Sequence, residues 1–201
     1  MNIKTVGVLG SGQMGRGTAH VAALAGYKVI FYNHRLVTLE KALKYIESEL
    51  DKGIERGKTT QEDKERTLTN ITITDQLSDL AKADFLIESL PEVLEVKQQA
   101  FAELDKLCGP EVIFATNTTS LSITELASVT DRPDRFIGMH FFNPADRMKL
   151  VEVISGINTP VETKEAILEI SKSLGKTPVE VAEGPGYGLQ QIRQLLLPQP
   201  V

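Results

Sequence analysis

His140 and Glu152 are the two side chains of this sequence best suited to moving a proton. Both lie in the segment IGMHFFNPADRMKLVEV, which puts the histidine at the end of one predicted strand and the glutamate in the next. A carboxylate beside an imidazole fixes the tautomer of the ring and stabilises the imidazolium that forms when the ring takes a proton. Such a pair could act as the base in the oxidation of an alcohol. The sequence indicates no carboxylate partner of this kind for His20 or His34, and we expect these two histidines to be packed or exposed residues.

A second group of polar residues, from Asn117 to Ser120 in ATNTTSLSITEL, follows another predicted strand. In open α/β sheets, ligands bind outside the carboxyl ends of the strands. We therefore expect the amide of Asn117 and the hydroxyl of Thr119 to face a bound cofactor and its substrate.

The glycine-rich stretch GSGQMGRG comes directly after the apolar run VGVL. Gly10, Gly12 and Gly15 occupy the three places of a G-x-G-x-x-G motif: the tight turn, the close approach to pyrophosphate, and the contact of helix with sheet. The motif alone is a weak signal, but here it lies between a predicted strand and a predicted helix, and a second strand follows. Backbone N–H groups at the start of that helix would face the pyrophosphate. The stretch therefore predicts dinucleotide binding.

The sequence leaves the choice of dinucleotide open. Asn33 stands where an acidic residue normally bonds the 2′-hydroxyl of the ribose. Asparagine can bond a hydroxyl, but it lacks the charge that repels a 2′-phosphate, and His34 and Arg35 beside it could attract one. NAD is the expected cofactor and NADP the alternative, unless His34 and Arg35 are simply exposed loop residues.

Short β-branched runs alternate with helical patterns along the chain, which predicts βαβ units and a parallel sheet. The expected strands are IKTVGVL, KVIFY, NITIT, DFLIESL, VIFAT, RFIGMHF, LVEVI and TPVEVA. The expected helices run to Gly26, from about residue 37, and over residues 75–81, 91–107, 122–129 and 160–174. Apolar residues at helical spacing, followed by the polar stretch KTTQEDKER, predict a helical hairpin after the second strand. The fold class is therefore a doubly wound, mostly parallel α/β sheet of the Rossmann type with a helical hairpin insertion.

Several residues are expected at the ends of these helices. The predicted capping boxes are Thr59 with Glu62 and Ser122 with Glu125. The predicted N-cap, N1 and N3 residues of the helix over 160–174 are Thr159, Pro160 and Glu162. The predicted helix-ending glycines are Gly26 and Gly175.

Composition narrows the class of protein. A chain of 201 residues with 41% hydrophobic content can bury a core of its own. Its net charge of −5 and the absence of a basic block argue against nucleic acid as a partner. Cys108 is the single cysteine, which excludes an internal disulfide and fits a reducing compartment; we expect it to be a packed residue. We find no secretion signal and no apolar run of membrane-spanning length. We therefore expect a cytoplasmic protein, or a mature organellar protein whose targeting segment has been removed, with no membrane partner.

The motifs GSGQMGRG, ESLPEVLEVKQQAF, ATNTTSLSITEL and GMHFFNPADRMKLVEVISG together resemble the 3-hydroxyacyl-CoA dehydrogenases, particularly the short-chain 3-hydroxybutyryl-CoA type. The likeness runs from about residue 3 to residue 186. It implies an NAD-binding domain whose helical hairpin contacts coenzyme A, an acyl-CoA substrate and no metal. It also implies a helical C-terminal domain that dimerises and closes the cleft.

The resemblance assigns roles to individual residues. His140 would be the catalytic base and Glu152 its partner, while Thr119 stands at the place of a substrate-contacting serine. The implied cofactor contacts are Gly10, Gly12, Gln13, Met14, Gly15, Asn33, Glu92, Lys97, Asn117 and Asn143. The implied contacts with the coenzyme A phosphates are Arg56 and, beside it, Lys52 and Lys58.

The resemblance stops after GPGY. Gln190 and Gln191 replace an expected asparagine and arginine, and the chain then ends without the helical domain. We therefore predict a dinucleotide-binding domain over residues 1–184 and a linker with a remnant of the second domain over residues 185–201. The apolar side chains expected to drive self-association into a homo-oligomer are Leu189, Ile192, Leu195 and Leu196.

Two other functions stay open at this stage. The chain as given could be a nucleotide-binding module with little or no catalysis, because one wall of the substrate cleft would be lacking. It could also be a related alcohol or hydroxyacid dehydrogenase, although those enzymes usually employ a lysine base and this sequence offers His140 with Glu152.

Overall fold

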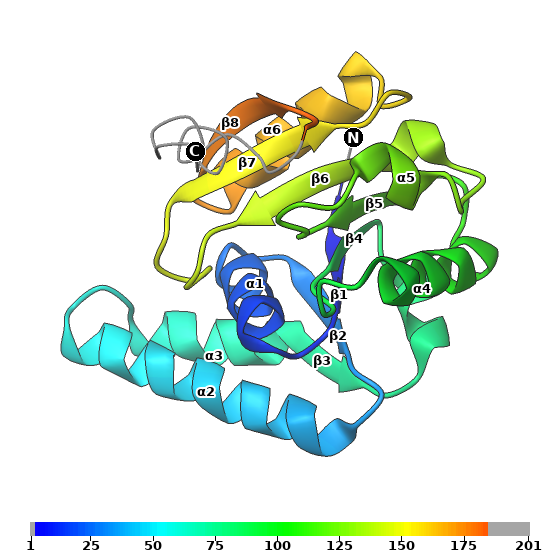
Figure 1. Ribbon diagram of the computed structural model, residues 1–201. Coiled ribbons are helices and arrows are strands. Elements are labelled where there is room, and N and C mark those ends of the chain that lie inside the picture. The colour runs from blue at the N-terminus through cyan, green and yellow to red at the C-terminus, as the bar shows by residue number, and fades with distance from the viewer. Residues whose placement is uncertain (1–2, 185–201) are drawn as a thin grey trace, which may run out of the picture.

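A computed structural model of the protein describes residues 3–184. Their centre is an eight-stranded sheet in the order β3-β2-β1-β4-β5-β6-β7-β8 (Figure 1). The strands are β1 Thr5–Leu9, β2 Lys28–Tyr32, β3 Ile71–Thr74, β4 Phe85–Glu88, β5 Ile113–Thr116, β6 Phe136–Phe141, β7 Leu150–Ser155 and β8 Thr177–Ala182. The helices are α1 Gln13–Leu24, α2 Leu36–Glu55, α3 Gln61–Asn70, α4 Leu94–Leu107, α5 Ile123–Ala127 and α6 Val161–Ser173. Two 3-10 helices, η1 Leu77–Lys82 and η2 Pro133–Arg135, complete the described elements.

The sheet confirms the predicted doubly wound α/β class. The first six strands in this order, from β3 at the edge to β6, all run parallel. Strand β7 pairs antiparallel with β6, and β8 pairs parallel with β7. The order of the first six strands is that of a dinucleotide-binding sheet, and its carboxyl ends gather at one edge. All eight predicted strands are present.

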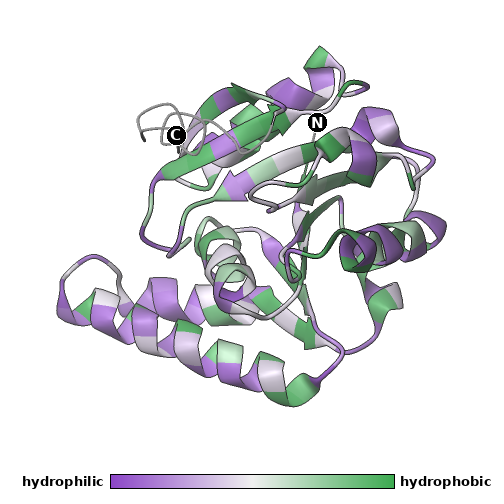
Figure 2. Ribbon diagram, in the orientation of Figure 1, coloured by the Kyte–Doolittle hydropathy of each residue, from purple (hydrophilic) through white to green (hydrophobic). Residues whose placement is uncertain are grey.

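Both faces of the central strands are buried, which explains why these strands read as continuous apolar runs. On one face, Val8 and Phe31 pack with residues of α1, α2 and α6. On the other face, Leu86 and Phe114 pack with residues of η1, α4 and α5. Along α2 and α4, by contrast, hydrophilic and hydrophobic residues are interspersed (Figure 2).

Helices α2 and α3 form the predicted hairpin, which extends from the body of the molecule at the lower left of Figure 1. The side chains that bury α2 against the body recur at helical spacing: Leu39, Ala42, Ile46 and Leu50. The capping box at the start of α3 consists of Thr60 and Asp63, so the predicted pair of Thr59 and Glu62 is wrong by one residue. A Cβ on Gly53 would lie 2.6 Å from Oγ1 of Thr59, so Thr59 packs against α2 within the hairpin turn instead of capping α3.

Helix α6 also begins one residue later than expected, because Pro160 is its N-cap and Val161 its first residue. The hydroxyl of Thr159 serves the preceding turn instead, where it accepts from the N–H of Gly156 and donates to the carbonyl of Phe136.

At α5, the hydroxyl of Ser122 accepts from the N–H of Glu125, which is the serine half of the predicted capping box. The carboxylate at this helix start is that of Glu183, which accepts from the hydroxyls of Ser122 and Thr124 at 2.6 Å each. Gly26 and Gly175 follow helix ends with φ of +98° and +70°, as their positions predict.

Two further helix predictions differ from the structure, and a third set of predictions concerns residues that the structure does not describe. The predicted helix over 75–81 is the 3-10 helix η1, and the one over 91–107 begins at Leu94. The predictions for residues 185–201, including Gln190, Gln191 and the apolar stripe, lie outside the described residues. Within residues 3–184, none of the helices has the length and apolar character needed to cross a membrane.

Candidate active site

A cavity of about 530 Å³ opens at the carboxyl ends of β1, β2, β4 and β5. Four segments that directly follow these strands form its walls, because parallel strands deliver their carboxyl ends to one edge of the sheet. The lining residues are Gly10, Ser11, Gly12, Gln13, Met14, Asn33, His34, Ser89, Leu90, Pro91, Glu92, Asn117 and Thr119. The volume is within the range of ordinary ligand sites.

The local structure explains why glycine stands at each of the three motif positions of the loop. Gly10 has a φ of +101° and donates its N–H to the carbonyl of Tyr32, which turns the chain tightly after β1. A Cβ on Gly15 would lie 1.8 Å from the carbonyl oxygen of Gly10, so only glycine allows α1 to approach the loop this closely. A Cβ on Gly12 would meet no described atom within 4 Å, so Gly12 borders open space.

The start of α1 is suited to an anion. Gly12 is the N-cap, no side chain caps the helix, and its first turn carries no acidic residue. Backbone N–H groups and the positive end of the helix dipole are therefore left for a negatively charged group, and Gln13 and Met14 of this turn line the cavity. A dinucleotide pyrophosphate fits this cradle.

Ser89 is a lining residue that the sequence analysis did not single out. Its Oγ is buried and has no hydrogen-bond partner among residues 3–184. A buried hydroxyl without a partner carries an energetic cost of about 1–3 kcal/mol. A polar group of a ligand in the cavity would remove that cost, and the position directly after β4 was the signal that could have found this residue.

His140 and Glu152 form a buried hydrogen-bonded pair, with 2.8 Å between Nδ1 and Oε2. The pair follows from strand register, because the two residues stand directly opposite each other in the antiparallel ladder of β6 and β7. Alternation along the strands sends both side chains to the face that α5 covers. The ring of His140 is also in contact with Phe142, with 4.7 Å between ring centroids.

Asn117 joins this pair to the cavity. Its side chain lines the cavity, and its Oδ1 accepts the N–H of Phe141, the residue after His140, at 2.7 Å. The loop after β6 in turn rests on α1, because a Cβ on Gly17 would lie 3.0 Å from Cβ of Ala145. The His140 end of β6 therefore adjoins both the cavity and the helix of the glycine loop.

Glu92 holds the loop that carries Thr119, another lining residue of the cavity. Its Oε1 accepts from the hydroxyl of Thr118, from the N–H of Thr119 at 2.8 Å and from the N–H of Ser120 at 3.1 Å. Burial raises the pKa of Glu92, but the hydrogen bonds from Thr118 and Thr119 and the charge of Lys97 outweigh burial and hold the pKa below its ordinary value. Glu92 is therefore ionised at neutral pH and fixes the loop that carries Thr119.

The cavity does not include every residue that the resemblance assigned to the cofactor. Lys97 is 1% exposed and lies behind the wall, where its Nζ contacts Glu88 at 2.6 Å and Glu92 at 3.5 Å. Asn143 is exposed in the loop after β6 and is not among the lining residues. Both assignments stay predictions.

Asn33 stands at the end of β2, as predicted for the residue that meets the ribose. Its Oδ1 accepts the N–H of Arg35 at 3.1 Å, so the amide nitrogen is the part left to face a ligand. His34 lines the cavity beside Asn33, while Arg35 is exposed and is not among the lining residues.

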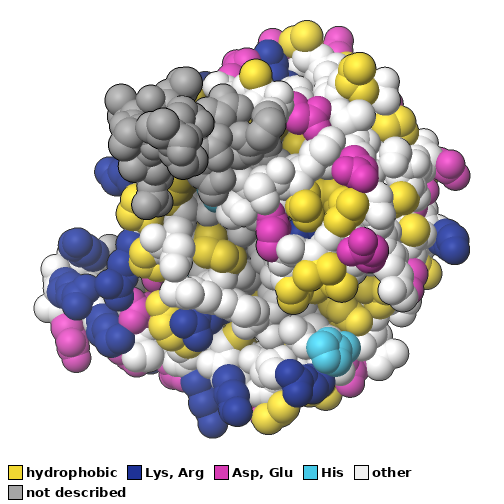
Figure 3. Space-filling model, viewed as in Figure 1, with side chains coloured by type: hydrophobic (Ala, Val, Ile, Leu, Met, Phe, Trp, Pro, Cys, Tyr) yellow, Lys and Arg dark blue, Asp and Glu magenta, His cyan; other side chains and the backbone are white. Residues whose placement is uncertain are grey.

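The expected coenzyme A contacts lie away from the cavity at the far end of the hairpin. Lys52 belongs to the last turn of α2 and contacts Glu49 at 2.7 Å, while Arg56 and Lys58 are exposed. Lys and Arg side chains gather over this end of the hairpin, at the left of Figure 3. Their role stays a prediction.

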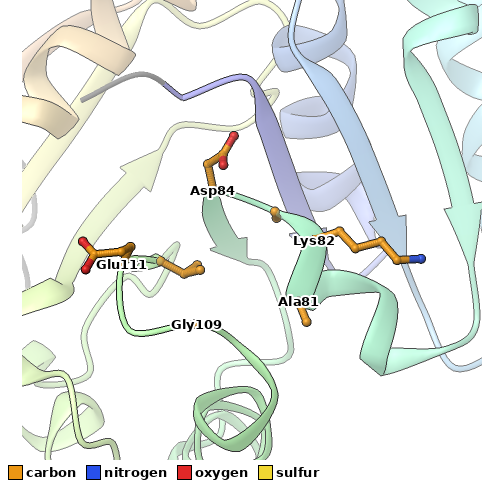
Figure 4. Close-up of a pocket in the computed structure, with 7 residues that line it drawn as sticks. Ala81, Lys82, Asp84, Gly109 and Glu111 are labelled. Carbon is orange, nitrogen blue, oxygen red and sulfur yellow. The ribbon is translucent and has the colours of Figure 1, made fainter.

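A smaller cavity of about 370 Å³ lies near Lys82, Asp84, Gly109 and Glu111 (Figure 4). It is at the amino ends of β4 and β5, opposite to the edge where ligands of such sheets bind. The carboxylate of Asp84 accepts the N–H groups of Lys4 and Thr5 at 2.9 Å, so its role is to join β1 to β4.

Comparison with known proteins agrees with this geometry. The family described as "3-hydroxyacyl-CoA dehydrogenase, NAD binding domain" matches residues 5–184. The chain is 43% identical to the 3-hydroxyadipyl-CoA dehydrogenase of Escherichia coli over 96% of this chain and 40% of that protein. It is also 43% identical to the probable 3-hydroxybutyryl-CoA dehydrogenase of Bacillus subtilis, over 93% of this chain and 65% of that protein.

Among solved structures, (S)-3-hydroxybutyryl-CoA dehydrogenase from Ralstonia eutropha superposes with a TM-score of 0.93 at 40% identity, over 96% of this chain and 68% of that one. The chain spans 40% to 66% of the length of the first curated relatives that it matches. The chain belongs to the 3-hydroxyacyl-CoA dehydrogenase family and carries its NAD-binding domain.

Proposed function

We propose that the protein interconverts 3-hydroxyacyl-CoA and 3-oxoacyl-CoA with NAD as the hydride carrier. The observation that carries this proposal is the His140–Glu152 pair beside the cavity at the carboxyl ends of the strands. The names of the relatives support the acyl-CoA class of substrate. In the oxidative direction, the C3 hydroxyl loses its proton, C3 loses a hydride, and the C–O single bond becomes a carbonyl.

Each residue of the pair has one task. Nδ1 of His140 is hydrogen-bonded to Glu152, and the ring would act as the base that takes the proton of the C3 hydroxyl. Glu152 orients the ring and stabilises the positive charge that the ring gains. The N–H of Thr119 is held by Glu92, and its hydroxyl would turn from Glu92 to donate to the substrate oxygen. Bound NAD supplies the acceptor for the hydride.

The residues that would hold NAD are those of the glycine loop together with Asn33, Ser89, Glu92 and Asn117. The cradle left by the glycines and the buried hydroxyl of Ser89 fit a polar ligand of this kind. Arg56 and Lys52 would meet the phosphates of coenzyme A from the hairpin.

The test is a spectrophotometric assay of acetoacetyl-CoA reduction by NADH. We expect turnover by the wild-type chain and a loss of at least about a hundredfold in kcat for His140→Ala, the scale of general acid–base catalysis. Glu165→Gln, a change on α6 away from the cavity, is the control and should leave kcat unchanged. Equal turnover by His140→Ala and the wild type would overturn the proposed mechanism.

A second candidate is a nucleotide-binding module with little catalysis. It predicts saturable NADH binding in calorimetry with no acetoacetyl-CoA turnover. The first candidate predicts both binding and turnover.

The cellular setting is also a proposal. A single, buried cysteine is consistent with a protein of the cytoplasm. A homo-oligomer is expected from the sequence, and light scattering across protein concentrations would test it.

A further inference from the structure

A buried ion pair behind the cavity wall has no part in the mechanism above. Glu88 at the end of β4 and Lys97 in α4 are each 1% exposed, and their charged atoms are 2.6 Å apart. Glu88 also accepts from the hydroxyl of Thr116 at 2.7 Å and from the N–H of Leu90. Burying two charges costs several kcal/mol per ion, and a well-packed apolar pair is often at least as stable. Stability alone therefore does not account for a charged pair at this position.

Lys97 stands between two carboxylates. Its Nζ contacts Oε1 of Glu88 at 2.6 Å, the carbonyl of Leu90 at 3.3 Å and Oε2 of Glu92 at 3.5 Å. The segment from 89 to 92 lines the cavity, so Lys97 attaches this wall to the sheet from behind. Glu88 fixes Lys97, and Lys97 faces one oxygen of Glu92.

The other oxygen of Glu92 holds the loop of residues 118–120. Oε1 receives the N–H groups of Thr119 and Ser120, and also their hydroxyls at 3.1 and 3.3 Å. One carboxylate thus has a cation on one side and a set of loop donors on the other. The position of Thr119 depends on this carboxylate, and the carboxylate depends on Lys97.

We propose that Glu88 is a positioning residue that sets the cavity wall and the 118–120 loop through Lys97 and Glu92. Glu88 is not among the residues that line the cavity. This role of Glu88 rests on the proposed function only because it takes the cavity as the cofactor site. Lys97, which the resemblance assigned to the cofactor, acts on the cofactor through Glu92.

The direct test needs no ligand. Hydrogen exchange of the Thr119 and Ser120 amides is measured in the free 201-residue chain, for the wild type and for Glu88→Gln. Glutamine keeps the shape and removes the charge that holds Lys97, so we expect exchange of these two amides to speed up about tenfold or more. The matched control is Asp105→Asn, which breaks another buried pair, Asp105–Arg132, outside the cavity. It should leave the Thr119 and Ser120 amides protected. Unchanged exchange in Glu88→Gln would overturn the proposal.

A double variant separates positioning from stability. Removing one member of a buried pair leaves the other charge uncompensated, whereas replacing both restores a neutral core. Glu88→Gln combined with Lys97→Met should therefore regain thermal stability close to the wild type, while the two amides stay about tenfold less protected and NADH binds about tenfold more weakly.

Recovery of amide protection together with stability would show that the pair is only structural. A wild-type chain that does not bind NADH would count against the proposed function, and the exchange measurement would still decide the role of Glu88.

Discussion

Two alanine substitutions in the glycine loop should separate folding from cofactor binding. A Cβ on Gly15 would lie 1.8 Å from the carbonyl oxygen of Gly10 and 2.8 Å from its carbon. The backbone would have to move by about 1.6 Å to reach ordinary contact at 3.4 Å, and overpacking of this kind costs about 1–3 kcal/mol. Gly15→Ala should therefore lose both stability and NADH affinity.

Gly12→Ala is the informative partner of that variant. Its Cβ meets no described atom within 4 Å, and Gly12 has a φ of −66° and a ψ of −171°, which alanine adopts without strain. The free energy of unfolding should stay within about 0.5 kcal/mol of the wild type. The new methyl group would occupy the space in which the backbone approaches pyrophosphate, so the Kd for NADH should rise about tenfold, a loss of about 1.4 kcal/mol.

The assay is urea unfolding and calorimetric NADH titration on the wild type and both variants. We expect Gly15→Ala to be unstable and Gly12→Ala to be stable but to bind NADH weakly. Wild-type NADH affinity in Gly12→Ala would refute the assignment of this loop to the cofactor.

Three further predictions concern other parts of the molecule. Hydrogen bonds from Lys52 and Arg147 lower the pKa of Glu49 to about 2. Its contribution to stability is therefore full above the ordinary value of 4.5 and is lost as the pH falls toward 2. Because both partners are exposed, we expect Glu49→Gln to cost about 1 kcal/mol in urea unfolding at neutral pH and clearly less at about pH 2, where half of the carboxyls are protonated; an equal cost at both would contradict this origin. Asn33→Asp should weaken NADPH binding at least about tenfold relative to NADH, because a carboxylate repels a 2′-phosphate; an unchanged ratio of the two Kd values would show that this residue does not meet the ribose. Burial raises the pKa of the Cys108 thiol to about 11, so a thiol reagent should modify the native protein no faster than the protein unfolds, and rapid labelling would contradict its burial.

The sequence was sufficient to predict the sheet because its strands are buried on both faces. The segments VIFA and FIGM are continuously apolar for that reason, and each is followed by a polar residue, Thr116 or His140, toward the ligand-binding edge. The pairing of His140 with Glu152 was also readable, because two adjacent strands joined by a short loop bring facing residues together.

The start of α3 could not be fixed from the sequence alone. KTTQED offers two threonines with an acidic residue three positions on, and both registers satisfy a capping box. The packing of Thr59 against Gly53 decides between them, and this contact depends on how the hairpin closes.

The burial of individual polar side chains also could not be predicted from the sequence. Lys97 belongs to an amphipathic helix on which a lysine ordinarily faces solvent, and only tertiary structure shows that Glu88 encloses it. Ser89 follows directly after β4, a position that could have marked it as a candidate, but its burial without a hydrogen-bond partner among residues 3–184 is seen only in the structure. Glu183, after the last strand, has no distinguishing pattern until its neighbours in space are known.

The claim that Glu152 acts in catalysis through His140 is tested most directly by a double-mutant cycle on kcat, with acetoacetyl-CoA and NADH as substrates. If the two residues work as a unit, Glu152→Gln should lower kcat at least about tenfold in the wild-type background and have almost no further effect in His140→Ala. Equal effects of Glu152→Gln in both backgrounds, at unchanged NADH affinity, would contradict the account.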